Sequence, residues 1–209
     1  LAKKIRLATI LGTIQSTYTH LPYLRPVWRK NTEEERLLGV SLTGIMDNEI
    51  TSKPTKELLN SLRSVAIQTN SETSERLGIN PSAAITCVKP SGTVSQLVDS
   101  ASGIHARHSD YYIRTVRGDN KDPLTKFLTD SGIPAEACVM KPDSTTVFSF
   151  PVKAPDGAVT RNDMSAIEQL ELWKTYALNW CEHKPSVTIT VRDEEWLKVG
   201  SWVYDNFDI

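Results

Sequence analysis

At residues 85–97 the chain reads Ile85-Thr86-Cys87-Val88-Lys89-Pro90-Ser91-Gly92-Thr93-Val94-Ser95-Gln96-Leu97. The apolar first part has the composition of a buried strand, and Pro90 ends it because proline has no N–H to donate to a sheet. Ser91 or Thr93 can then cap a helix, since their hydroxyls accept hydrogen bonds from N–H groups of the first turn. The stretch therefore predicts a strand, a tight turn and the start of a helix.

A turn of this kind is a candidate anion site. The first N–H groups of a helix lack acceptors within the helix, and with the positive end of the helix dipole they favour a phosphate. Gly92 lets a ligand approach the backbone closely, and Lys89 adds a positive charge nearby. The plainer alternative is a strand-to-helix turn with a serine cap and no ligand. The Gly-x-x-x-x-Gly-Lys-Ser/Thr loop of nucleoside triphosphatases does not match, which excludes that mechanism.

On either side of this turn, helical and extended signals alternate. Helices are predicted over residues 2–18, 55–77, 123–131 and 165–181, strands over residues 37–46, 83–88, 111–117, 145–152 and 186–191, and a polar turn or short helix at 31–36. Gly78 directly follows the clearest apolar stripe and is a common helix stop. Asp122 with Pro123, and Ser165 with Glu168, mark two further helix starts. This alternation predicts parallel strands covered by helices in one α/β unit.

The composition limits the function classes. Lys and Arg number 24 and Asp and Glu 25 among 209 residues, so the net charge of −1 argues against a protein that binds nucleic acid through its phosphate backbone. No apolar run approaches the roughly 20 residues of a membrane span. The first residues do not form a signal peptide, and three widely spaced cysteines do not make a disulfide framework. We therefore expect a cytoplasmic protein with no membrane and no nucleic-acid partner.

The turn and its surroundings resemble the large catalytic subunit of ribonucleotide reductases. The match begins with Pro90-Ser91-Gly92-Thr93-Val94-Ser95-Gln96 and continues through Ser100-Ala101-Ser102-Gly103-Ile104-His105, which is similar to the family's loop for the substrate phosphates. Six further segments match in order, at residues 36–44, 111–114, 122–124, 148–153, 166–171 and 186–189. The likeness covers nearly the whole chain and is greatest to the adenosylcobalamin-dependent (class II) enzymes.

This resemblance implies an α/β fold that forms the C-terminal portion of a ten-stranded α/β barrel. Residues 1–209 would be a partial catalytic barrel domain, a fragment without an internal domain boundary. The chain also opens without Met and inside a helical pattern, as a fragment would. The backbone amides of Ser91, Gly92, Thr93 and Val94, after Pro90, would hold the phosphates of a ribonucleotide.

The same resemblance implies a reaction and its partners. The family converts ribonucleotides to 2′-deoxyribonucleotides by thiyl-radical chemistry, and the class II enzymes use adenosylcobalamin. The radical and redox cysteine motifs are not in this chain, so we expect it to supply the phosphate loop, no catalytic residue and no metal site, and to be inactive alone. The expected partners are a ribonucleoside di- or triphosphate, the remaining N-terminal part of the reductase and a thioredoxin-type reductant.

Three alternatives stay open at this point. The sequence also fits the diiron-dependent class I version of the same reductase, because the regions specific to each cofactor are absent. It fits a non-catalytic phosphate- or nucleotide-binding α/β module, and it fits a structural piece of a split protein. The flanking coding sequence separates these, since the reductase needs an upstream Asn-x-Cys-x-Glu stretch and a finger-loop cysteine.

The cysteines and tryptophans have plainer interpretations than catalysis. Cys87 is expected to be a small buried residue, because no base lies beside it in the sequence. Cys138 has no Cys-x-x-Cys partner, and Cys181 with His183 offers too few ligands for zinc. The tryptophans are expected to pack on helical faces, namely Trp173, Trp180, Trp196 and Trp202.

A polar cluster follows the candidate phosphate loop, at His105, Arg107, His108 and Asp110. We expect a loop whose cations, together with Arg114 and Arg117, add to the positive field near a phosphate. A metal site and a nucleic-acid patch are less favoured alternatives, because no further ligand cluster and no other basic run appears.

Overall fold

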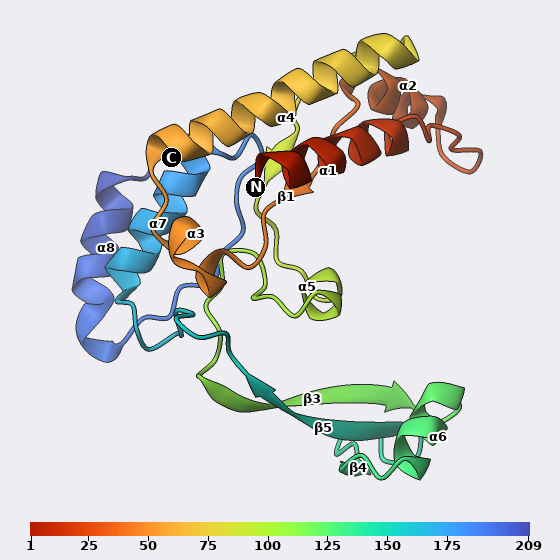
Figure 1. Cartoon of the computed structure of the whole chain (residues 1–209), viewed down its shortest axis with the longest axis vertical. Coiled ribbons are helices and arrows are strands. Elements are labelled where there is room, and N and C mark those ends of the chain that lie inside the picture. The colour runs from red at the N-terminus through yellow and green to blue at the C-terminus, as the bar shows by residue number, and fades with distance from the viewer. The chain divides into compact units, whose positions relative to one another are not determined.

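The computed structural model describes all residues, 1–209, and the chain packs into two compact units (Figure 1). The first unit contains residues 1–107 and 157–209, and the second contains residues 108–156. The expectation of a single partial barrel domain over residues 1–209 stays a prediction. No helix of the chain combines the length and the apolar character that a membrane crossing requires.

The first unit is mainly helical around a short parallel sheet. Its strands are β1 (Val40–Ser41) and β2 (Thr86–Cys87), and its helices are α1 (Ala2–Gln15), α2 (Pro26–Glu35), η1 (Ile45–Asp47), α3 (Glu49–Ser52), α4 (Lys56–Leu77), α5 (Val94–Leu97), α7 (Ala166–Asn179), η2 (Asp193–Glu195) and α8 (Trp196–Asp205). The register pairs Val40 with Thr86, which confirms the predicted parallel arrangement. Both strands are much shorter than the sequence predicts.

Helix α4 forms as expected, whereas its buried face and that of α1 differ from the predicted stripes. The Thr55 side chain caps α4, and Gly78 ends it at φ +65°. Asn70 on α4 is buried because it donates hydrogen bonds to the hydroxyls of Thr13 and Ser82. The sequence predicts an apolar stripe on α1 at Ile5, Ala8, Leu11 and Ile14, but Leu11 is 67% exposed. Buried threonines replace it, since their hydroxyls bond to the carbonyls of the preceding turn.

The predicted strand at 186–191 does not form. Its backbone N–H groups bond to single partners: Ser186 to the Val88 carbonyl, Thr188 to the His105 ring and Thr190 to the Gln169 side chain. A strand needs a continuous ladder with one neighbour, and strand composition does not supply that neighbour.

The core of the first unit lies between the two strands and helices α1, α4 and α7. Tyr176 and Trp180 of the α7 region are fully buried in it. The Tyr176 hydroxyl donates to the Thr51 carbonyl at 2.7 Å, and the Trp180 ring N–H donates to the Cys87 carbonyl at 2.8 Å. The Trp180 bond fixes the end of α7 against the strand that precedes the candidate phosphate loop, and the Tyr176 bond fixes α7 against α3.

The second unit is a three-stranded antiparallel sheet with one helix. Strands β3 (Tyr111–Asp119), β5 (Thr145–Lys153) and β4 (Ala135–Ala137) lie in the order β3-β5-β4, and α6 spans Pro123–Asp130. The two long strands and the Asp122 cap of α6 confirm the predicted elements. The antiparallel pairing corrects the expectation of parallel strands throughout. Local composition identifies a strand, whereas its direction depends on how the chain returns to the sheet.

Candidate functional site

The loop that follows β2 is closed by two serines. The Ser91 hydroxyl accepts a hydrogen bond from the Ser95 N–H at 2.8 Å, and the Ser95 hydroxyl donates to the Ser91 carbonyl. Ser91 therefore supplies the predicted capping bond, while the Thr93 side chain makes none. Helix α5 has only four residues, so a helix dipole adds little here.

Three consecutive backbone donors remain open in this loop. The N–H groups of Gly92, Thr93 and Val94 have no acceptor in the chain, and all three residues are exposed. The Ser91 N–H is already used, because it donates to the Ser102 hydroxyl at 2.8 Å. A row of outward backbone N–H groups favours an anion. The structure thus brings together three of the four predicted amides as free donors.

The glycine that the loop requires is Gly103, which the sequence analysis did not single out. Its φ is +57°, and a Cβ at this position would lie 2.7 Å from the Lys89 carbonyl oxygen. A Cβ added to Gly92 would meet nothing within 4 Å. The fold therefore demands glycine at Gly103, and only a ligand could demand it at Gly92. The family-like stretch at residues 100–105 was the one sequence signal available for Gly103.

The polar cluster does not form the expected field of free cations. Arg107 is buried, with 4% of its side chain exposed, and its guanidinium Nε lies 2.8 Å from Asp47. The His105 ring bonds to the Ser102 carbonyl through Nδ1 and accepts from the Thr188 N–H at Nε2, a pattern that assigns the proton to Nδ1. No group of three or more His, Cys, Asp or Glu side chains is placed to hold a metal.

The remaining members of that cluster belong to the second unit. His108 lies edge-on to the Tyr112 ring, with 6.1 Å between ring centroids. Arg114 and Arg117 are on β3. Their predicted contribution to a phosphate site in the first unit stays a prediction.

Lys89, expected to add charge beside the loop, has its ammonium 3.4 Å from the Lys184 carbonyl oxygen. That contact gives the ammonium a partner outside the loop. The Lys89 backbone N–H donates to the Ser41 hydroxyl of β1 at 3.0 Å. The residue thus links the start of the loop to the parallel sheet.

Glu182 holds the outer edge of β2 and was missed by the sequence analysis. One carboxylate oxygen accepts the backbone N–H groups of Ile85 at 2.8 Å and Thr86 at 3.2 Å, both from buried residues. The other oxygen lies 3.6 Å from the Arg63 guanidinium. Glu182 thus takes the hydrogen bonds that a neighbouring strand would accept. Its separation from Ile85 by 97 residues left no local signal.

The three thiols are buried and free, and no disulfide forms. Burial raises the pKa of Cys87 and raises the pKa of Cys181 to about 12, which makes both poor nucleophiles. These directions agree with the structural interpretation of Cys87. The pKa of Cys138 is lowered, because the backbone N–H groups of Met140 and Lys141 and the side chain of Arg117 donate to its sulfur.

All three thiols are buried, so alkylation of the folded chain requires local opening. We expect Cys138, whose pKa is lowered, to be the first thiol that iodoacetamide then alkylates, at a pH below that needed for an ordinary cysteine. Cys87 and Cys181 should react only after unfolding, because burial disfavours their thiolates. Mass spectrometry of the labelled peptides across a pH series measures the order. All three should react alike in guanidinium, and native labelling of Cys181 before Cys138 would contradict the assignment.

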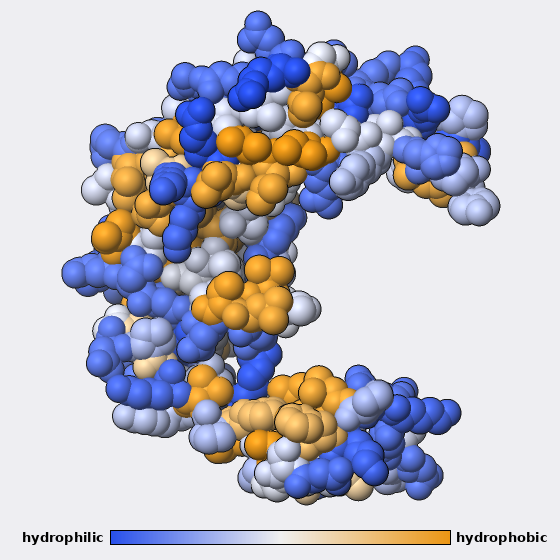
Figure 2. All heavy atoms as spheres, turned by 45° about the vertical axis from the view of Figure 1, so that its right-hand side comes forward, coloured by the Kyte–Doolittle hydropathy of each residue, from blue (hydrophilic) through white to orange (hydrophobic).

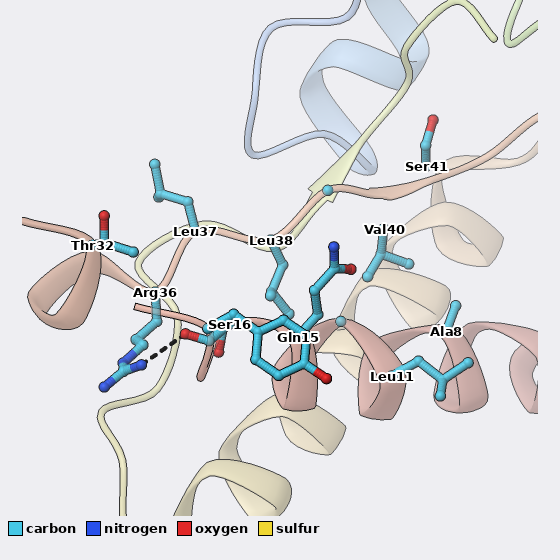
Figure 3. Close-up of a pocket in the computed structure, with 13 residues that line it drawn as sticks. Ala8, Leu11, Gln15, Ser16, Thr32, Arg36, Leu37, Leu38, Val40 and Ser41 are labelled. Atoms are coloured by element: carbon cyan, nitrogen blue, oxygen red, sulfur yellow. Dashed lines mark hydrogen bonds between the residues drawn. The ribbon is translucent and has the colours of Figure 1, made fainter. Parts of the chain in front are cut away.

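A groove of about 590 Å³ runs between α1 and β1 (Figure 3). Leu11, Leu37 and Leu38 line it, and Arg36 is fixed at its rim by a 2.7 Å bond from its guanidinium to the Ser16 carbonyl. The N–H groups of Leu38, Val40 and Leu42 bond toward β2. The N–H groups of the residues between these point the other way, toward the groove, and have no acceptor in the chain. The groove thus follows an open strand edge.

Comparison with known proteins gives a consistent set of relatives. No protein-family model matches the chain. The adenosylcobalamin-dependent ribonucleoside-triphosphate reductase of Euglena gracilis is 33% identical over 192 residues, which cover 86% of this chain and 26% of that protein. The enzyme of the same name from Lactobacillus leichmannii is 29% identical over 215 residues, covering 88% of this chain and 29% of that protein.

The fold agrees with these relatives. A crystal structure of a B12-dependent (class II) ribonucleotide reductase matches with a TM-score of 0.79 and 25% identity, over 95% of this chain and 32% of that chain. This match confirms the predicted fold class, a mixed α/β portion of the reductase fold. The chain spans between about a quarter and a third of the length of these proteins. It is therefore a homologue of one segment of the adenosylcobalamin-dependent (class II) ribonucleotide reductases.

Proposed function

We propose that this chain is the phosphate-binding segment of an adenosylcobalamin-dependent ribonucleotide reductase, which converts a ribonucleoside triphosphate to its 2′-deoxy form. The observation that carries the proposal is the row of three exposed N–H groups without acceptors, at Gly92, Thr93 and Val94. It lies within the stretch that resembles the family's phosphate loop. The relatives' shared name supplies the triphosphate as substrate class.

Each predicted residue has a distinct part in the proposed site, Pro90 to Val94. Pro90 ends the strand, and Ser91 closes the loop through Ser95 while its own N–H stays on Ser102. The amides of Gly92, Thr93 and Val94 hold the phosphate oxygens. Backbone donors carry no net charge, so a chain of net charge −1 can bind a polyphosphate without a basic surplus.

The groove between α1 and β1 does not fit adenosylcobalamin. This 590 Å³ groove is open and lined largely by small and apolar residues, and the Arg36 guanidinium at the rim is already held by the Ser16 and Glu33 carbonyls. We assign the cofactor and the radical chemistry to the rest of the catalytic subunit. This segment orients the substrate by its phosphates, which reduces the entropy cost of placing the ribose for reaction.

Replacing Gly92 with valine should raise KM for the ribonucleoside triphosphate at least about tenfold in the complete catalytic subunit. A branched side chain there narrows the approach to the free amides, yet its Cβ meets no atom of the chain within 4 Å. Steady-state kinetics and calorimetric binding measure the effect. Gly200→Val is the matched control, because a Cβ at Gly200 also meets nothing within 4 Å. An unchanged KM in Gly92→Val would contradict the assigned loop.

The remaining part of the reductase is the proposed partner of the groove between α1 and β1. The open N–H groups of β1 need a strand beside them, and the surface around them combines leucines with polar side chains. Apolar side chains also remain exposed elsewhere on both units (Figure 2). In this proposal a thioredoxin-type dithiol protein of the cytoplasm supplies electrons to the completed enzyme.

Leu11→Lys should abolish association of this chain with the separately expressed remainder of the catalytic subunit. Leu11 lines the groove and is 67% exposed, so lysine there leaves the chain's own core intact while placing a charge among the leucines of the proposed interface. Co-purification and sedimentation measure the association. Leu197→Lys on α8, an exposed leucine outside the groove, is the control. Normal assembly of the Leu11 variant would place the interface elsewhere.

A further inference from the structure

An ion pair between the buried Arg107 and the partly buried Asp47 holds the segment that follows the proposed phosphate loop. The Arg107 guanidinium contacts Asp47 twice, through Nε at 2.8 Å and Nη2 at 3.2 Å. The same group donates to the Asp99 carbonyl at 2.8 Å and lies 3.3 Å from the Asp99 carboxylate. One guanidinium therefore joins η1 to Asp99, the second residue after α5.

Asp47 also holds the chain where it returns from the loop. Its second carboxylate oxygen accepts the Ala101 N–H at 2.7 Å. The Ala101 carbonyl accepts from the Gly44 N–H at 2.7 Å and from the Thr43 hydroxyl at 2.9 Å. Both the N–H and the carbonyl of Ala101 are thus held by residues of the segment that follows β1.

Two contacts carry this fixed position to the loop itself. The Ser102 hydroxyl accepts the Ser91 N–H at 2.8 Å. Gly103 packs so closely on the Lys89 carbonyl that no side chain fits between them. Arg107 and Asp47 are therefore linked to the first residue of the loop through hydrogen bonds and tightly packed backbone.

The energetics of the pair favour a role in geometry. A buried ion pair adds little net stability over apolar residues, because desolvation offsets the attraction. A planar, two-sided guanidinium nevertheless fixes direction better than an apolar contact does. It also holds Asp99 at φ +45°, a conformation that is unfavourable for a residue other than glycine.

We propose that Asp47 and Arg107 are positioning residues for nucleotide binding, which hold the amides of Gly92, Thr93 and Val94 in one direction through Ser102. This inference rests on the proposed function of the loop. The pair does not touch the nucleotide. It reduces the ordering that the loop must undergo when the phosphates bind, so its loss weakens binding more than it slows turnover.

The test uses Asp47→Asn and Ser102→Ala in the complete catalytic subunit. Both variants should raise KM for the ribonucleoside triphosphate, and Ki for inorganic tripolyphosphate as competitor, about tenfold, while kcat changes less than about twofold. The matched control is Glu195→Gln. Glu195 is a buried carboxylate that, like Asp47, accepts backbone N–H groups, in its case from Ala166 and Arg192, and it has no contact with the loop.

A loss of stability alone would not raise KM and Ki. Asp47→Asn and Glu195→Gln should both lower Tm, but only the former should raise KM and Ki. If Asp47→Asn fails to fold, Ser102→Ala decides, because it removes only the last link. Unchanged KM and Ki in Ser102→Ala, with Gly92→Val impaired, would overturn the positioning role and leave the proposed function standing. Unchanged values in Gly92→Val as well would overturn both.

Discussion

Replacing Gly103 with alanine is expected to lower the free energy of unfolding by about 3 kcal/mol, the combined cost of a strained backbone and an overpacked contact. The residue adopts φ +57°, and the new Cβ would lie 2.7 Å from the Lys89 carbonyl oxygen. The Lys89 backbone cannot move aside as a flexible side chain does, so the loop must shift as a whole. Chemical denaturation followed by circular dichroism measures the loss.

Gly78→Ala separates the two causes. Gly78 has a similar φ of +65°, but nothing lies within 4 Å of an added Cβ. Its replacement should cost only about 1 kcal/mol, the backbone term alone. Equal losses at Gly78 and Gly103 would show that the contact with Lys89 is not a constraint on the fold.

Removing the Glu182 side chain in Glu182→Ala is expected to cost about 3 kcal/mol. Two N–H groups of buried residues, on Ile85 and Thr86, lose their acceptor, and Arg63 loses its carboxylate. Unfolding by denaturant gives the magnitude. Exchange of the Ile85 and Thr86 amide hydrogens with deuterium should accelerate selectively, because these are the donors released.

Glu168→Ala provides the control for this change. Glu168 also accepts a backbone N–H and a hydroxyl, both from Ser165, but it does so at an exposed helix start. Water can replace these bonds, so the loss should be near 1 kcal/mol, as for an ordinary cap. If Glu182→Ala lowers the free energy of unfolding as little as Glu168→Ala does, solvent reaches the edge of β2.

The predictions that succeeded depend on neighbours in the sequence. The Ser165–Glu168 capping box, the Asp122 cap and the Thr55–Gly78 limits of α4 all involve contacts within one or two turns. Such contacts form from the same residues wherever the helix lies in the molecule. The candidate phosphate loop was proposed on the same kind of signal, since its proline, serine and glycine lie within a few residues, and its role stays a prediction.

The predictions that failed depend on distant partners. Residues 186–191 have strand composition but no ladder, and the apolar stripe of α1 leaves Leu11 exposed beside the open edge of β1. Arg107 was expected to be a free cation, and its pairing with Asp47 spans 60 residues. No local pattern distinguishes a buried arginine from an exposed one, because burial is decided by what packs against it.

The sequence by itself determined the limits of α4, α6 and α7 and the strand–turn–helix character of residues 85–97, because short-range hydrogen bonding and local composition depend on consecutive residues. The relation to class II reductases came from the resemblance of its motifs to that family, not from composition or spacing. Only the tertiary structure decided which amides of the loop stay free, which glycine the fold requires and which carboxylates hold the loop in place. These depend on the Ser91–Ser102, Gly103–Lys89 and Asp47–Ala101 contacts, which join segments that only folding brings together.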